Sequence, residues 1–196
     1  MTNSAKNSDL IGRTIDDRYE LLETLGRGSA GTVYRALQLA VEREVAIKIM
    51  HPQLAMDQDF GRRFELEAKA VARLDHPCII TLHDFGFCSK SSVHYMVTEL
   101  VEGDPLSHWT RGRADISVPD ILSIAIQVAE ALSHAHEKDV LHRDMKPANI
   151  MVRRTQYGGV RAKILDFGLA QLREHDKSEW DLTKPGQVHG TPLYMS

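Results

Sequence analysis

A run of glycines near the N-terminus could close over phosphate groups. Glycine occupies the first, third and sixth positions of the segment Gly26-Arg27-Gly28-Ser29-Ala30-Gly31-Thr32-Val33. Glycine lets the backbone turn tightly and approach an anion with its N–H groups pointing inward. Alone, the segment is equally consistent with a plain glycine-rich hairpin. The strand-like stretch 32–34 that follows disfavours a Rossmann fingerprint, which opens a helix, and the Gly-Lys-Ser/Thr of a P-loop is absent from the sequence.

Three further motifs follow the glycine segment in order. They are Val45-Ala46-Ile47-Lys48, His142-Arg143-Asp144-Met145-Lys146-Pro147-Ala148-Asn149 and Asp166-Phe167-Gly168. Each has an ordinary structural explanation when it is taken alone. A lysine can end a buried strand by extending its amine to water, and Asp-Phe-Gly is a common turn sequence. Four motifs in this order and at these separations, however, are not expected by coincidence.

The elements that must position these motifs fall into two parts. Alternating apolar residues predict strands at 19–25, 32–36, 44–49, 79–85 and 93–100. Apolar residues spaced by three and four predict an amphipathic helix at 58–74, which His76-Pro77 ends.

After residue 104 the pattern changes to a long helical stripe at 121–135. Two short strands, 150–152 and 162–165, flank a Tyr157-Gly158-Gly159 turn, and 172–196 read as polar loop. The sequence therefore predicts an α+β protein. It has a flexible tail at 1–17, a β-rich lobe with one helix at 18–100, and a mainly helical lobe at 101–196.

Composition excludes several classes of protein. An apolar fraction of 42% and a charged fraction of 26% are those of a globular protein, and a net charge of −3 argues against nucleic-acid binding. Two cysteines, Cys78 and Cys88, are too few for a disulfide framework and favour free thiols in a reducing cytoplasm. Residues 1–10 lack the apolar core of a signal peptide. The stretch 121–135 is interrupted by polar residues such as Gln127, so no membrane segment is expected.

Together the four motifs resemble the signature set of the protein kinase family, and the resemblance extends over 19–196. The sequence of 142–149 is most similar to that of bacterial, eukaryotic-like Ser/Thr kinases. The resemblance implies a protein-kinase-like fold with an N-lobe at 18–100 and an incomplete C-lobe at 101–196. It also implies transfer of the ATP γ-phosphate to a Ser/Thr hydroxyl of a protein.

The family resemblance gives the charged residues specific roles. Lys48 would hold the α- and β-phosphates, with Glu67 as its partner and Glu65, on another face of the helix, as the alternative. Asp144 would accept the proton of the substrate hydroxyl, and Lys146 would neutralise the γ-phosphate. Asp166 would bind the Mg²⁺ that bridges the phosphates, and Asn149 would bind a second Mg²⁺.

The resemblance also implies a nucleotide site. Its glycine loop would consist of Leu25, Gly26, Arg27, Gly28, Ser29, Ala30, Gly31, Thr32 and Val33. Thr98 would lie at the back of the adenine pocket. The Glu99 carbonyl and the Val101 N–H would pair with the adenine edge. Val33, Ala46 and Met151 would sandwich the base, and ordinary core packing is compatible with that role.

Other implications concern class and regulation. Lys146 and the sequence Gly190-Thr191-Pro192 resemble the pattern of Ser/Thr kinases rather than that of tyrosine kinases. Arg143 implies control by a phosphate in the following loop, where Ser178 and Thr183 are candidate acceptors. Dimerisation for autophosphorylation is a further expectation.

The family pattern would continue beyond Ser196 with Pro-Glu and several helices. The sequence is therefore expected to be a piece of a longer chain or a truncated product, and a membrane anchor outside 1–196 stays open. Two functions follow: an active Ser/Thr kinase in the full-length form, or an ATP-binding or interaction module without transfer activity. Intact Lys48, Asp144, Asn149 and Asp166 favour the kinase.

Overall fold

The computed structural model describes residues 10–56, 59–109 and 116–167. Its contacts divide the chain into two units, one formed by 1–68 and 81–100 and the other by 69–80 and 101–196. One division between the units follows Leu100. Residues 69–80 group with the second unit instead of the first, because this segment pairs with a strand of that unit.

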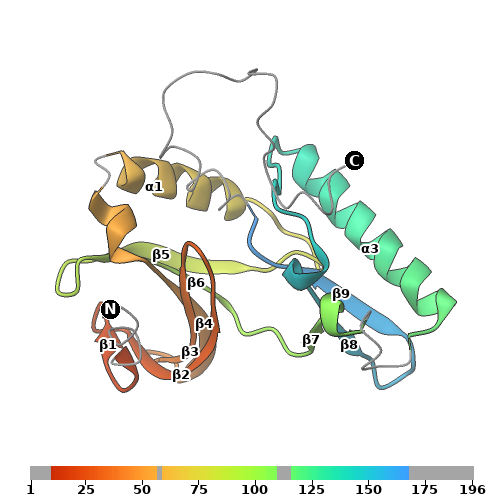
Figure 1. Ribbon diagram of the computed structural model, residues 1–196, viewed down its shortest axis with the longest axis horizontal. Helices are drawn as coiled ribbons and strands as arrows, with labels where there is room; N and C mark the ends of the chain where they lie inside the picture. The colour runs from red at the N-terminus through yellow and green to blue at the C-terminus, as the bar shows by residue number, and fades with distance from the viewer. Residues whose placement is uncertain (1–9, 57–58, 110–115, 168–196) are drawn as a thin grey trace, which may run out of the picture. The chain divides into compact units, whose positions relative to one another are not determined.

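The first unit is built on an antiparallel six-stranded sheet in the order β1-β2-β3-β4-β6-β5 (Figure 1). Its strands are β1 (Thr14–Ile15), β2 (Tyr19–Arg27), β3 (Gly31–Gln38), β4 (Arg43–Met50), β5 (Leu82–Cys88) and β6 (Val93–Glu99). Four of these strands lie where the sequence predicted them, to within a few residues. The fifth prediction, 79–85, is shifted: β5 begins at Leu82, and Ile79 forms a bridge with Ile164 in the second unit.

Strand β1 corrects the prediction of a flexible tail at 1–17. Thr14 pairs with Glu20, and Ile15 pairs with Tyr19 and is buried. Asp16 and Asp17 adopt positive φ angles of 52° and 55°, which turn the chain back sharply. Aspartate tolerates this conformation better than most side chains do. A strand of two residues is too short for an alternation signal, whereas residues 1–9 lie outside the described part of the chain.

The side chains on one face of this sheet form a hydrophobic core. Side chains that alternate along the strands pack together there and are almost fully buried. This core comprises Ile15, Tyr19, Leu21, Tyr34, Ala36, Val45, Ile47, Ile49, Cys88, Tyr95, Val93 and Val97. The alternate residues of β3 and β4 project from the opposite face, and they include Lys48.

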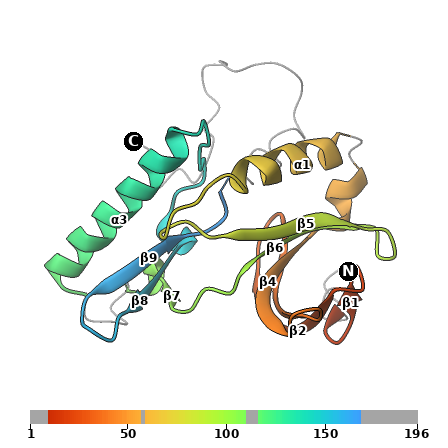
Figure 2. The same ribbon diagram turned by 180° about the vertical axis from the view of Figure 1, so that it is seen from behind.

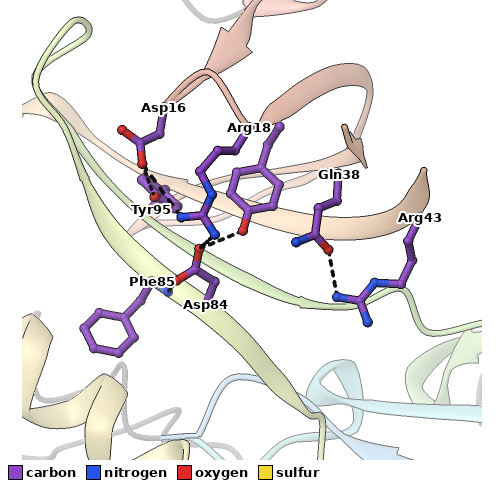
Figure 3. Close-up of polar contacts among 8 residues, drawn as sticks. Asp16, Arg18, Gln38, Arg43, Asp84, Phe85 and Tyr95 are labelled. Atoms are coloured by element: carbon purple, nitrogen blue, oxygen red, sulfur yellow. Dashed lines mark hydrogen bonds and ion pairs between the residues drawn. The ribbon is translucent and has the colours of Figure 1, made fainter. Parts of the chain in front are cut away.

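A polar network joins the β1–β2 turn to β5 and β6 (Figure 3). The Arg18 guanidinium lies 2.8 Å from Asp84 Oδ2, and Tyr19 donates a 2.7 Å hydrogen bond to the same oxygen. Tyr95 donates to Asp16 at 2.9 Å. Burial and these hydrogen bonds raise the pKa of both tyrosines. The two hydroxyls are therefore donors throughout the physiological pH range, and they hold the turn on the sheet.

Helix α1 (Phe60–Val71) follows a 3-10 turn, η2 (Pro52–Met56). Its buried side chains recur at helical spacing, and two of them, Phe60 and Phe64, contact the sheet. The Phe60 ring lies 5.2 Å from that of His94 on β6, and the Phe64 ring lies 6.3 Å from that of Phe85 on β5. The predicted helix is thus confirmed, although its described bounds are shorter than 58–74.

The second unit contains a long helix and a three-stranded sheet in the order β7-β8-β9 (Figure 2). Its elements are β7 (Asp104–Pro105), α2 (Leu106–His108), α3 (Val118–His136), η4 (Pro147–Asn149), β8 (Ile150–Arg154) and β9 (Val160–Ile164). Helix α3 packs on β9 through a core that includes Ile124, Val160 and Ala162. Gly158 and Gly159, with φ of 80° and 84°, supply the β8–β9 turn, as the sequence predicted.

Local sequence explains where α3 begins. Ser117 accepts a hydrogen bond from Asp120 N, and Asp120 accepts one from Ser117 N, which completes a capping box. Pro119 lies in the first turn, where its missing N–H costs nothing. In the described part of the chain, no helix is both long and apolar enough to cross a bilayer. Both cysteines are buried free thiols.

Candidate active site

The register of the first sheet brings four predicted nucleotide-site residues onto one face. Val33 on β3 is the cross-strand partner of Lys48 on β4, and Ala46 on β4 is the partner of Thr98 on β6. Because side chains alternate along a strand, Ala46 and Lys48 share a face, and so do their partners. Val33, Ala46 and Thr98 are half-buried. Lys48 therefore projects from the same face as these three residues, which is the face opposite the hydrophobic core.

The glycine segment forms the hairpin between β2 and β3. Leu25 lies at a register shift of β2, where it bulges between Thr24 and Gly26, and its side chain is exposed. Gly28 N donates to Gly31 O at 2.9 Å and closes the turn. A Cβ atom on Gly31 would overlap the Ile49 carbonyl, so this position requires glycine. The tip of the loop is exposed at Ser29.

Lys48 is only 8% exposed and is thus one of the few buried charged residues among those described. Glu67 lies on α1 one turn from the buried Phe64, and it is half-buried. Glu65, the alternative partner, is exposed. Burial favours Glu67 over Glu65 because an ion pair of a buried lysine needs a carboxylate that is also withdrawn from water. The pairing of Lys48 with Glu67 stays a prediction.

Residues at the end of β6 are held by backbone and side-chain bonds. Glu99 N donates to Thr81 O at 3.1 Å, and Thr81 N donates to the Glu99 carboxylate at 2.7 Å. Thr98 Oγ1 donates to the Glu99 carbonyl at 3.2 Å. Glu99 is thereby fixed at the strand end. In the second unit, Val101 and Met151 are each half-buried. The adenine roles of Glu99, Val101 and Met151 stay predictions.

The loop before η4 gathers three predicted residues around one carboxylate oxygen. Lys146 Nζ lies 2.7 Å from Asp144 Oδ2. Asn149 Nδ2 donates to the Asp144 carbonyl at 2.8 Å and approaches Oδ2 at 3.4 Å. The Asp144 side chain is 12% exposed and that of Lys146 is 26% exposed. Such a carboxylate, fixed by neighbours and still partly open to water, can accept a proton from a bound hydroxyl.

His142 ties this loop to the segment that carries Asp166. Its Nε2 donates to the Leu165 carbonyl at 2.7 Å, and its Nδ1 accepts from Asp144 N at 3.3 Å. The His142 ring also packs edge-on against Phe167, with centroids 4.8 Å apart. Burial lowers the pKa of His142, so the neutral Nε2–H form is favoured. These contacts give His142 a structural role, because it connects the loop to the segment after β9.

Asn149 and Asp166 have the donor chemistry that a hard divalent cation needs. Asn149 is 9% exposed, and its amide nitrogen is engaged by Asp144, which leaves its amide oxygen as an acceptor. Asn149 O accepts from Leu165 N at 2.8 Å, next to the half-buried Asp166. Asp166 has a positive φ of 56°. No group of three or more His, Cys, Asp or Glu side chains in the described ranges could hold a metal alone. A carboxylate and an amide suit an ion that keeps water or phosphate ligands.

Sequence reasoning treated Gln127 only as a polar interruption of a helical stripe. In the structure its side chain contacts the edge of β9 that faces away from β8: Nε2 donates to Val160 O at 3.1 Å, and Oε1 accepts from Ala162 N at 3.0 Å. Nε2 also contacts Ser123 Oγ at 3.1 Å. A glutamine in the middle of an apolar stripe is itself a signal, since polar groups withdrawn from water have partners, and Gln127 is half-buried. Gly168, Ser178, Thr183 and Thr191 lie outside the described residues.

The first unit thus carries a glycine hairpin and a buried strand lysine, and the second unit carries an aspartate loop with the predicted cation ligands Asn149 and Asp166. The family model for the protein kinase domain matches residues 19–196. The chain belongs to the protein kinase domain family.

Curated relatives and solved structures agree with this assignment. The chain is 36% identical to the serine/threonine-protein kinase PrkC of Bacillus subtilis, over 95% of this chain and 27% of PrkC. It is 40% identical to a probable serine/threonine-protein kinase of Corynebacterium efficiens, over 93% of this chain and 27% of that protein. The PknI kinase domain of Mycobacterium tuberculosis, as a double mutant, matches with a TM-score of 0.69 and 34% identity, over 81% of this chain and 63% of that one. The chain thus spans about a quarter of the length of these curated relatives.

Proposed function

We propose that the protein is a serine/threonine protein kinase, which transfers the γ-phosphate of ATP to a Ser or Thr hydroxyl of a protein substrate. The observation that carries this proposal is the cluster around Asp144. A single carboxylate oxygen is contacted by Lys146, while Asn149 clamps the backbone of the same aspartate. Phosphoryl transfer needs positioning and charge neutralisation more than covalent chemistry by the protein, and this cluster supplies both.

Each residue of the cluster has a distinct part in the proposed reaction. Asp144 orients the substrate hydroxyl and accepts its proton as the oxygen attacks phosphorus. Lys146 stabilises the negative charge on the transferred phosphoryl group. His142 holds the loop by its bonds to Leu165 O and Asp144 N, so these groups do not have to be ordered at the moment of reaction.

We assign nucleotide binding to the exposed face of the first sheet and its glycine hairpin. Lys48 holds the α- and β-phosphates, with Glu67 as its carboxylate partner. Val33 and Ala46 contact the base from the sheet, and Met151 contacts it from β8. The Glu99 carbonyl and the Val101 N–H pair with the adenine edge. The half-buried, apolar character of Val33, Ala46 and Met151 supports this role.

The divalent ion in this proposal is Mg²⁺. Asp166 would supply a carboxylate oxygen to one Mg²⁺ and Asn149 an amide oxygen to a second, and both are ligand types that this hard cation takes. When bound, Mg²⁺ would supply positive charge to neutralise the phosphate oxygens. The protein holds its two ligands through the Leu165 N to Asn149 O bond, which fixes the strand end before Asp166 to the loop that carries Asn149.

The substrate class and the regulation rest on the family resemblance. Lys146, two residues after Asp144, supports a Ser/Thr rather than a tyrosine acceptor. The exposed Arg143 supports control by phosphorylation in the loop that follows Asp166. Dimerisation would serve autophosphorylation, and a cytoplasmic location would give the site access to ATP.

The test is phosphate transfer from radiolabelled ATP to a generic protein substrate, followed by identification of the labelled amino acid. The wild-type protein should label serine or threonine. Asp166→Ala removes a metal ligand and should abolish most of that transfer, whereas Asp139→Asn, which removes an exposed carboxylate but tolerates the positive φ of 59° at this position, should leave it unchanged. A folded wild-type protein that binds Mg·ATP but transfers nothing would instead indicate a nucleotide-binding module without kinase activity.

A further inference from the structure

His51 touches the glycine loop through two separate groups. It follows β4 directly, three residues after Lys48. Its backbone N–H donates to the Ala30 carbonyl at 3.0 Å, and its ring Nε2 lies 3.0 Å from the Gly28 carbonyl. A carbonyl oxygen can only accept, so Nε2 carries the hydrogen and donates. One residue therefore holds two carbonyls of the loop.

The geometry of the peptide bond turns these two contacts into a constraint on the loop's N–H groups. In a trans peptide the C=O of one residue and the N–H of the next point in opposite directions within one plane. Fixing the Gly28 carbonyl on the imidazole therefore turns the Ser29 N–H away from His51. Fixing the Ala30 carbonyl does the same for the Gly31 N–H.

The other contacts of the loop do not fix the direction of the Ser29 and Gly31 N–H groups. The Gly28 N to Gly31 O bond closes the turn but involves neither the Gly28 nor the Ala30 carbonyl. The close approach of Gly31 to the Ile49 carbonyl seats the base of the loop on β4. The exposed tip at Ser29 would be free to rotate its peptide planes without a donor such as His51.

We infer that His51 is a positioning residue for nucleotide phosphates: its backbone N–H and its imidazole hold the glycine loop with the Gly31 and Ser29 N–H groups, respectively, turned toward the phosphate chain. The inference rests on the proposed function and adds to it a residue outside the four kinase motifs. Oriented N–H groups attract anions, so their effect should be confined to ligands that carry phosphate. His51 itself need not touch the nucleotide.

The experiment compares the affinities of Mg·ATP and adenosine, by calorimetric titration, in three variants of the protein. His51→Phe keeps a ring but removes the donor. His51→Gln places an amide Nε2 near the position of the imidazole Nε2 and keeps the donor. His136→Phe makes the same chemical change at an exposed position at the end of α3, as a matched control.

We expect His51→Phe to weaken Mg·ATP binding by roughly three- to tenfold, as the loss of one hydrogen bond does, with adenosine binding unchanged. His51→Gln should lie within about twofold of the wild type, in keeping with a conserved donor. Equal Mg·ATP affinity in His51→Phe and wild type would overturn the inference, and so would an equal loss for ATP and adenosine. Hydrogen exchange of residues 28–31 should rise in His51→Phe even without nucleotide. The two proposals can also fail separately. If the wild-type protein bound no ATP but hydrogen exchange of 28–31 still rose in His51→Phe, the proposed function and the role of His51 in phosphate binding would both be wrong. The contact between His51 and the loop would still stand.

Discussion

The orientation and the charge of single side chains in this protein depend on the groups that contact them. Asp144 is one case, because its carboxylate, carbonyl and N–H are each engaged, by Lys146, Asn149 and His142. A carboxylate that is already oriented loses little entropy when a substrate hydroxyl binds. Lys48 is a second case, since its burial leaves the ammonium dependent on negative partners.

Lys48→Ala should therefore weaken Mg·ATP binding while the protein stays folded. Charge-assisted hydrogen bonds contribute about 1.5–3 kcal/mol, which corresponds to roughly a 10- to 100-fold loss of affinity. The matched control is Lys90→Ala, which removes an exposed lysine paired with Asp17 on the surface. Titration of Mg·ATP into both variants checks the prediction. Equal affinity in Lys48→Ala and wild type would mean that another group holds the phosphates.

His142 should make the stability of the protein depend on pH. Burial lowers its pKa below the ordinary value of about 6.5. Between the two pKa values the unfolded chain binds a proton that the folded chain does not. The contribution of His142 is therefore complete above about pH 6.5 and is lost as the pH falls below it. Protonation would also remove Nδ1 as the acceptor for Asp144 N.

Urea unfolding at pH 7.5 and at pH 5.5 measures this loss. His142→Gln keeps a donor for the Leu165 carbonyl but does not titrate, so its stability should fall less between these pH values than that of the wild type. His83 and His94, whose pKa values burial also lowers, remain in both proteins and cancel in the comparison. Identical pH dependence in the two proteins would refute the assignment.

At the scale of elements, α3 serves as a support for β9 and the segment that follows it. Val160 and Ala162 alternate with exposed residues, and their side chains pack on α3. Backbone groups of both residues on the edge away from β8 are hydrogen-bonded by the Gln127 amide. The chain continues from the end of β9 at Ile164 through Leu165 to Asp166. One glutamine thus satisfies the part of the edge that the bridge between Ile79 and Ile164 does not reach.

Gln127→Leu should destabilise the second unit. It leaves Ala162 N and Val160 O without the amide, and each unsatisfied backbone group costs about 1–3 kcal/mol. Ile126→Gln is the control, because Ile126 is 59% exposed and its replacement should change stability by less than about 0.5 kcal/mol. Urea unfolding gives both values, and hydrogen exchange should place the loss on 160–164. A Gln127→Leu protein as stable as the wild type would mean that water replaces the amide without cost.

Elements with a strong local pattern could be predicted from the sequence. The five long strands and both long helices follow from alternation or from helical spacing, as at Phe60 and Phe64 on α1. Strands β1 and β7 could not be predicted, because two residues carry no period and their pairing depends on turns such as the one at Asp16 and Asp17. The start of β5 at Leu82 could not be predicted either. Ile79, which the sequence placed in this strand, pairs instead with Ile164, a residue 85 positions further along the chain.

At the scale of the whole molecule, the order of the motifs predicted the family. The contacts between residues could not be predicted from the sequence. Lys48, Asp144, Asn149 and Asp166 were predicted as site residues from motifs that resemble the family's signature set, and their side-chain types are compatible with phosphate, proton and cation chemistry. Gln127 and His51 act through backbone groups distant in sequence, so only the fold reveals what they contact. In the proposed function each unit supplies its own group of residues: a sheet face with Lys48 in the first unit, and the Asp144 loop in the second.

The measurement that tests the central claim most directly is the rate of phosphate transfer from ATP to a Ser/Thr protein in Asp144→Asn. Asparagine keeps the shape and the contact with Lys146 but cannot accept the proton. General-base catalysis contributes about 10²–10⁴ in rate, so transfer should fall by that factor while Mg·ATP affinity stays near the wild-type value. Transfer at the wild-type rate in a folded Asp144→Asn protein would contradict the account, because the carboxylate at its centre would then have no role in the reaction.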